Sequence, residues 1–160
     1  MSIAFALPLP RMDTLFSEPT RTAVRTVDPS RTDPRLAATK TETSDRALRD
    51  LFNTYLECRT PDWDGHGALP VSLETLEMTL RVLEVLPPGL PRPTFGAEPD
   101  GELTMEWYRS PRRLLSLSIG NAGDLNYAAL LGAERIFGRI LFCGAIPDNL
   151  IALIRKVSTK

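Results

Sequence analysis

The run PPGLPRP at residues 87–93 divides this chain into two parts with different hydrophobic periods. Before it, apolar residues recur every three or four positions, which is typical of amphipathic helices. After it, apolar and polar residues alternate, which is typical of half-buried strands. The prolines end the preceding helix because proline has no N–H to continue the backbone hydrogen-bond ladder. Helical segments followed by a run of strands favour an α+β fold.

Two helices are predicted before this run. The first begins near Ser44, which can cap it, and continues for about 14 residues. The second runs from Ser72, also a capping residue type, to Leu86. The apolar stripe of the first helix consists of Leu48, Leu51, Phe52, Tyr55 and Leu56. Each helix therefore has one face suited to packing on a sheet.

Five short strands are predicted after the run, joined by short turns that favour antiparallel neighbours. A closing helix is expected from Pro147, since proline suits the first helical turn. The predicted fold class is α+β, with two N-terminal helices, a four- to five-stranded antiparallel meander and a C-terminal helix packed on one face. The expected strands are Thr94 to Glu98, Leu103 to Tyr108, Leu114 to Ile119, Leu125 to Leu130 and Arg135 to Phe142.

Residues 1–43 differ from the rest of the chain. They contain eight threonines and five prolines but no glycine and no periodic apolar face. We expect a low-complexity Thr/Pro/Arg tail, flexible or pinned by a partner, before a single α+β domain at 44–160. The alternating apolar start of the tail can add a strand to a sheet edge. The candidate partner-binding residues in the tail are Phe5, Leu7, Arg21, Arg25 and Arg31.

Charge and cysteine content argue against several classes of protein. With 19 basic and 20 acidic residues, the net charge of −1 gives no global field for nucleic acid or an anionic membrane. The two cysteines form no CxxC pair, which argues against a disulfide framework or a zinc ribbon. No stretch approaches the roughly 18 apolar residues of a membrane span, and the N-terminus lacks the charged start of a signal peptide. We therefore expect a cytoplasmic protein that does not bind membranes.

Residues 62–70, DWDGHGALP, resemble a metal-binding loop because they combine two carboxylates with the only histidine. An EF-hand loop needs oxygen ligands at its first, third and fifth positions and a glutamate at the twelfth. Asp62 and Asp64 fit the first and third positions, but the fifth position is His66 and the twelfth is Leu73, neither of which supplies the required oxygen ligand. A zinc site needs three or four nitrogen and sulfur ligands, more than this loop offers. We predict no metal and no cofactor.

Catalysis by the same loop is an alternative. Asp62, Asp64 and His66 are the candidate catalytic residues of a small hydrolase or metal-assisted enzyme, with Cys58 or a strand serine such as Ser116 as nucleophile. A single histidine in a polar loop is more often structural or simply exposed. The favoured prediction is that the protein has no catalytic residues, with the question of catalysis left open.

A structural role accounts for more of the loop. Gly65 and Gly67 can adopt positive φ angles, and an aspartate such as Asp64 can accept hydrogen bonds from nearby backbone amides. Trp63 can fill the space between the helices and the sheet. We therefore interpret Trp63, Asp64, Gly65 and Gly67 as a structural loop that connects the two helices.

Several short motifs in residues 61–157 resemble a group of small, uncharacterised bacterial proteins. These are a W-D-G-aromatic-G-A loop, a P-D-G-E turn that leads into E-W, a Y-A pair and a closing I-P helix. The resemblance implies no activity, since none is assigned to the group. It also implies that His66 stands where the group tends to have tyrosine. The matching positions are Trp63, Asp64, Gly65, Gly67, Ala68, Pro99 to Glu102, Glu106, Trp107, Tyr127, Ala128, Ile146 and Pro147.

The segment WYRSPRR at residues 107–113 places aromatic and basic residues together at a hairpin. Aromatic rings stack on bases and arginines pair with phosphates, so Tyr108, Arg109, Arg112 and Arg113 are candidate binding residues. Acidic residues in the preceding turn and the acidic balance of the domain oppose this interpretation. No Walker loop, dinucleotide-binding fingerprint, HExxH or GxSxG motif is present.

The leading hypothesis is a small soluble, non-enzymatic protein-binding module that acts through its sheet and N-terminal tail. An adaptor, inhibitor, immunity protein or antitoxin would have this design, by analogy only. The alternatives are the hydrolase or metal-assisted enzyme at the loop and nucleic-acid binding at the arginine hairpin. The expected partner is another protein, and the sequence indicates neither its identity nor the oligomeric state.

Overall fold

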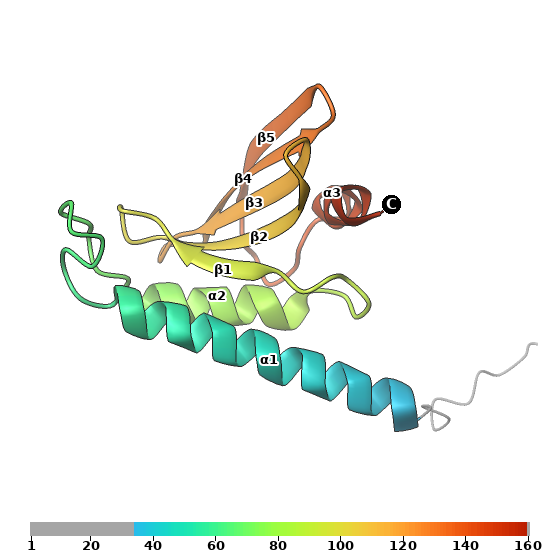
Figure 1. Cartoon of the computed structure of the whole chain (residues 1–160), viewed down its shortest axis with the longest axis horizontal. Helices are drawn as coiled ribbons and strands as arrows, with labels where there is room; N and C mark the ends of the chain where they lie inside the picture. The colour runs from blue at the N-terminus through green and yellow to red at the C-terminus, as the bar shows by residue number, and fades with distance from the viewer. Residues whose placement is uncertain (1–33, 160) are drawn as a thin grey trace, which may run out of the picture. The chain divides into compact units, whose positions relative to one another are not determined.

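The computed structural model describes the backbone of residues 34–159 and the side chains of residues 45–159. These residues belong to one compact unit, Asp33–Lys160. The unit is α+β, with three helices and one five-stranded antiparallel sheet (Figure 1). The helices are α1 (Pro34–Cys58), α2 (Leu73–Val85) and α3 (Asp148–Ser158). The strands are β1 (Thr94–Ala97), β2 (Leu103–Ser110), β3 (Arg113–Ile119), β4 (Asp124–Leu131) and β5 (Glu134–Leu141).

Helix α1 is longer than the sequence pattern predicts. It begins at Pro34, so Ser44 lies inside the helix instead of capping it. Proline suits a first helical turn, and the alanines and leucine that follow are good helix formers. The apolar stripe that was the basis of the prediction packs on the domain only in part, since Phe52 and Leu56 are exposed. Leu51 of this stripe is fully buried.

Helices α2 and α3 lie close to their predicted positions. The Ser72 hydroxyl accepts a hydrogen bond from the Thr75 N–H at 3.1 Å, which caps α2 as expected. Leu86 follows α2 as its C-cap. Pro147 is the N-cap of α3, one position before the helix begins. No helix within residues 34–159 is both long enough and apolar enough to cross a membrane.

The sheet is a simple meander, since its strand order is β1-β2-β3-β4-β5 and every neighbouring pair is antiparallel. Side chains alternate between the two faces of each strand. On β2, Leu103, Met105 and Trp107 point to the buried face. The predicted antiparallel meander is therefore confirmed, and it has five strands.

All three helices pack on this buried face. Leu51 of α1 belongs to a cluster with Leu76 of α2 and Leu103 of β2. A second cluster contains Met105 and Ile154, which join the sheet to α3. Figure 1 shows α1 and α2 running together along β1, with α3 farther along the sheet. The opposite face of the sheet, which we call the outer face, has no helix of residues 34–159 packed on it.

Candidate functional site

The loop between α1 and α2 is closed by backbone hydrogen bonds. The Asp62 N–H donates to the Ala68 carbonyl at 2.9 Å, and the Val71 N–H donates to the Cys58 carbonyl at 2.9 Å. Gly67 has a φ of 90°, which favours glycine, and Asp62 also has a positive φ of 61°. The Leu69 N–H donates to the Pro99 carbonyl at 2.8 Å, and this bond fixes the loop to the turn between β1 and β2.

The two carboxylates of this loop bind backbone amides. Asp62 Oδ1 accepts from the Gly67 N–H at 2.7 Å. Asp64 Oδ1 accepts from the His66 N–H at 2.8 Å and the Ala68 N–H at 3.1 Å. Donation by His66, and then by Ala68, lowers the pKa of Asp64 below its ordinary value, because these bonds favour the charged form. Both carboxylates therefore hold the loop in shape.

The remaining candidate catalytic residues do not converge on one site. The His66 ring is exposed, and its Nδ1 lies 2.8 Å from the carbonyl oxygen of its neighbour Asp64. Cys58 is buried, and this burial raises the pKa of its thiol. An activated thiol needs the opposite shift. Ser116 lies on β3 with its side chain on the outer face, and no hydrogen bond within residues 45–159 joins it to His66.

The structure also bears on metal binding at the loop. Within the side chains described, no three His, Cys, Asp or Glu residues are grouped so as to hold a metal ion. Trp63 is partly buried against the α1–α2 cluster, and its Nε1–H donates to the Leu69 carbonyl at 3.0 Å. The partly buried ring therefore connects the loop to the core.

An acidic group lies where the loop meets the sheet. A cavity of about 490 Å³ there is lined by the start of α2 and by the turns that follow β1 and β3. Glu102 lines it, and burial raises the pKa of this carboxyl group, with Asp100 and Glu98 adding to the effect. A side-chain hydrogen bond with Asn126 acts in the opposite direction. The carboxylates of Asp100 and Glu98 therefore repel that of Glu102, and the described residues that line the cavity include no lysine or arginine.

The outer face carries apolar side chains across four strands. Strand pairing places Tyr108 of β2, Leu114 of β3, Leu130 of β4 and Arg135 of β5 in one row. The next row ends in Phe137, which pairs with Ala128. Because the helices occupy the other face, these side chains remain accessible. We call Tyr108, Leu114, Ala128, Leu130 and Phe137 the apolar patch.

Phe137 is the most exposed large apolar side chain in residues 45–159, with 81% of its surface accessible. Leu141, also on β5, has 64% and Tyr108 has 59%. A lone exposed apolar residue is ordinary, but a contiguous group on one sheet face marks an interaction surface. The sequence pattern did not single out Phe137. Phe137 lies on the same face of β5 as Arg135 and Arg139.

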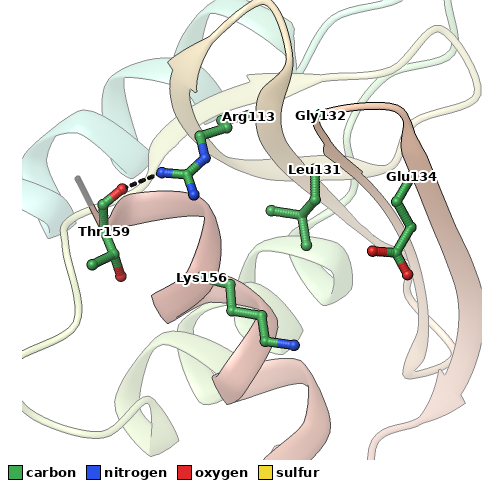
Figure 2. A pocket seen from close by; sticks show the side chains of 6 residues that line it. All are labelled: Arg113, Leu131, Gly132, Glu134, Lys156 and Thr159. Carbon is green, nitrogen blue, oxygen red and sulfur yellow. Dashed lines mark hydrogen bonds between the residues drawn. The ribbon is translucent and has the colours of Figure 1, made fainter.

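The arginine hairpin borders the apolar patch. Arg109 and Arg112 are exposed at the connection between β2 and β3. Arg113 instead donates from its guanidinium to the Thr159 carbonyl at 2.5 Å, which ties β3 to the end of α3 (Figure 2). Figure 2 also shows Lys156 and Glu134 on the walls of the adjoining cavity of about 490 Å³. Among residues 45–159, this hairpin therefore provides two cations without a salt bridge and one, Arg113, that is hydrogen-bonded to the end of α3.

The candidate residues of the N-terminal tail, Phe5, Leu7, Arg21, Arg25 and Arg31, lie outside the described residues. Their role stays a prediction. No family model matches this chain, and no curated protein or solved structure matches it either.

Proposed function

We propose that this protein is a binding module that recognises another protein through the outer face of its sheet. The observation that carries the proposal is the apolar patch, which Phe137 and Tyr108 dominate and which no described helix covers. Aromatic side chains supply most of the energy in many protein interfaces, since they bury a large area at low cost in entropy. The α-helices on the opposite face make the sheet a rigid support for such a contact.

The charges around the apolar patch indicate the chemistry of the partner. Arg109, Arg112 and Arg135 lie along the end of the sheet where the patch is found. A partner with an apolar centre and an acidic rim matches this arrangement, because complementary charge steers association and fixes orientation. An inhibitor, immunity protein, antitoxin or adaptor would use such a surface.

The test is site-specific photo-crosslinking in the cells that produce the protein. A photoreactive phenylalanine analogue replaces Phe137, and in a matched control it replaces Phe52, an aromatic on α1 with 44% of its surface exposed. We expect a discrete crosslink from position 137 to a protein other than this chain, and this product should be absent from position 52. Tyr108→Ala should lower the yield of that product. Equal products at both positions, or none at 137, would contradict the proposal.

Nucleic-acid binding is the second candidate. It is favoured by the exposed group of Tyr108, Arg109 and Arg112, which suits a stacked base flanked by phosphates. Binding of single-stranded DNA or RNA oligonucleotides at low salt, measured by fluorescence anisotropy, should then weaken steeply as salt is added. Unchanged affinity in Arg109→Glu and Arg112→Glu, or absence of binding at low salt, would remove this candidate.

A further inference from the structure

Among residues 34–159, strand β5 presents an open edge. It is last in the strand order and pairs with β4 alone. The opposite edge of the sheet, β1, is only four residues long and contacts α1. Strand β5 has eight residues and contains no proline. An edge of this length can pair with another strand, and natural proteins usually shorten, cover or interrupt such edges.

One hydrogen bond shows which backbone groups point to the free edge. The Phe142 N–H donates to the carbonyl of Gly123, the residue directly opposite, at 2.9 Å. Backbone groups alternate in direction along a strand, so Ile136, Gly138 and Ile140 also point toward β4. The N–H and C=O groups of the residues between them therefore point away from β4. These residues are Arg135, Phe137, Arg139 and Leu141.

We propose that a second copy of this chain pairs with this edge, antiparallel and about a two-fold axis, so that Gly138 lies opposite Gly138 of the other copy. The two five-stranded sheets would then form one continuous sheet. This proposal does not require the proposed function, because it concerns the edge of β5 and the proposed function concerns the outer face of the sheet.

Avoidance of like-charge pairs selects the register. Centred on Gly138, the pairing places Phe137 opposite Arg139 and Arg135 opposite Leu141, and β5 is paired along its length. Centred on Phe137, it would place Arg135 opposite Arg139 twice. Centred on Arg139, the pairing would place Arg139 of one copy opposite Arg139 of the other. Like charges directly opposite each other destabilise a strand pair, whereas a cation over an aromatic ring is attracted to it.

The buried face supports the same register. Ile136 and Ile140 are partly buried against the core and would meet across the new strand pair. The Arg135–Leu141 and Phe137–Arg139 pairs each occur twice about the two-fold axis. Each of these four pairs would form two backbone hydrogen bonds, about eight in all. On the outer face, Arg139 binds Asp124 through contacts of 2.8 and 3.0 Å, so the cation that meets Phe137 is already held in place.

Tyr127 gives an independent reason for a second copy. Its ring lies over Gly138 of its own chain, with the hydroxyl 2.6 Å from the position that a Cβ would occupy. This hydroxyl makes no hydrogen bond with the other side chains described. Adjacent strands are about 4.8 Å apart, so the two hydroxyls would come close together across the axis between the two glycines. A side chain larger than glycine at this position would block that approach.

The test is the mass of the full-length protein in solution, measured by light scattering and sedimentation over a range of concentrations. We expect a dimer. Leu141→Lys should weaken it by about tenfold or more, because it creates two like-charged pairs with Arg135. Leu141→Glu should maintain or strengthen it. Leu69→Lys, which places the same charge on an exposed leucine of the α1–α2 loop, is the matched control and should have no effect.

A monomer at every concentration would overturn the proposal, whether another part of the chain or a different protein covers the edge. A dimer that responds equally to Leu141→Lys and Leu141→Glu would also overturn it, because the contact would then lie elsewhere. Either result leaves the crosslink from position 137 to a different protein as a separate test, so the two proposals can fail independently.

Discussion

The Tyr127 ring covers Gly138 on the neighbouring strand. A Cβ built on Gly138 would stand 2.6 Å from the hydroxyl oxygen and 2.7 Å from Cζ of Tyr127. The two residues are directly opposite in the β4–β5 register. Glycine weakens a strand because it is entropically costly to order and contributes no side-chain packing. Here its backbone is covered by an aromatic ring, which restores part of that packing.

Gly138→Ala should therefore destabilise the protein, although alanine ordinarily suits a strand better than glycine. The added methyl group must displace the Tyr127 ring, and overpacking of this kind costs about 1–3 kcal/mol of unfolding free energy. Urea unfolding at one fixed protein concentration measures the change. In a Tyr127→Ala background the same substitution should be neutral or stabilising by up to about 1 kcal/mol. An equal loss in both backgrounds would show that the ring is not the cause.

Glu102→Gln should stabilise the protein at neutral pH. Burial, together with Asp100 and Glu98, raises the pKa of Glu102 in the folded protein above its value in the unfolded chain. The stability that the protonated form contributes is then complete below the unfolded pKa and is lost as the pH rises through the folded pKa. The side chain remains partly exposed, so solvent screening limits the gain from glutamine to a few tenths of a kcal/mol.

Unfolding temperatures of wild type and Glu102→Gln between about pH 3 and pH 8 test this prediction, because the range spans the ordinary pKa of glutamate. The gain should vanish at the acid end. Glu77→Gln removes the same charge from an exposed position on α2 and serves as the control. A gain of equal size at all pH values would mean that packing, and not ionisation, distinguishes the two proteins.

Asp64→Asn should have the opposite pH dependence. Hydrogen bonds from His66 and Ala68 lower the pKa of Asp64 in the folded protein. The stabilisation is therefore fully present above the unfolded pKa and is lost as the pH falls through the folded pKa. Asparagine keeps an oxygen acceptor but cannot titrate, so the stability deficit of the variant should shrink as the solution is acidified. A carboxyl chemical-shift titration that places the Asp64 pKa at or above its ordinary value would refute this account.

The α+β class and the five strands were predictable because each strand has a clear period of two and each turn contains glycine or proline. The register adds information that no single strand holds. Tyr108, Leu114 and Leu130 come from three different strands, and they form a row only because two antiparallel pairings place them side by side. The apolar patch was therefore not predicted from alternation alone.

The start of α1 could not be predicted for a different physical reason. The apolar stripe records where a helix packs, and Leu51 belongs to the packed part. Residues 34–43 show no periodic apolar face in the sequence, so the pattern could not place the start of the helix at Pro34. The residue types of the loop at 62–70 likewise allowed several chemistries. Only the positions of the amides around Asp62 and Asp64 show which bonds these carboxylates make.

His66→Tyr is the substitution that separates the binding and enzyme hypotheses. The His66 ring is exposed, and its one side-chain hydrogen bond among residues 45–159 joins Nδ1 to the Asp64 carbonyl, so its replacement should change unfolding free energy by no more than about 0.5 kcal/mol. The backbone N–H that binds Asp64 Oδ1 remains in the variant. The crosslink yield from position 137 should also be unchanged, because the loop lies at the α1–α2 connection and not on the outer face. Thermal unfolding and the crosslinking experiment together measure both quantities. The outcome that would contradict the binding hypothesis is a His66→Tyr protein that folds and crosslinks to its partner but no longer functions in its host. Such a result would assign a chemical role to the imidazole, because tyrosine retains an aromatic ring but cannot act as a base near neutral pH.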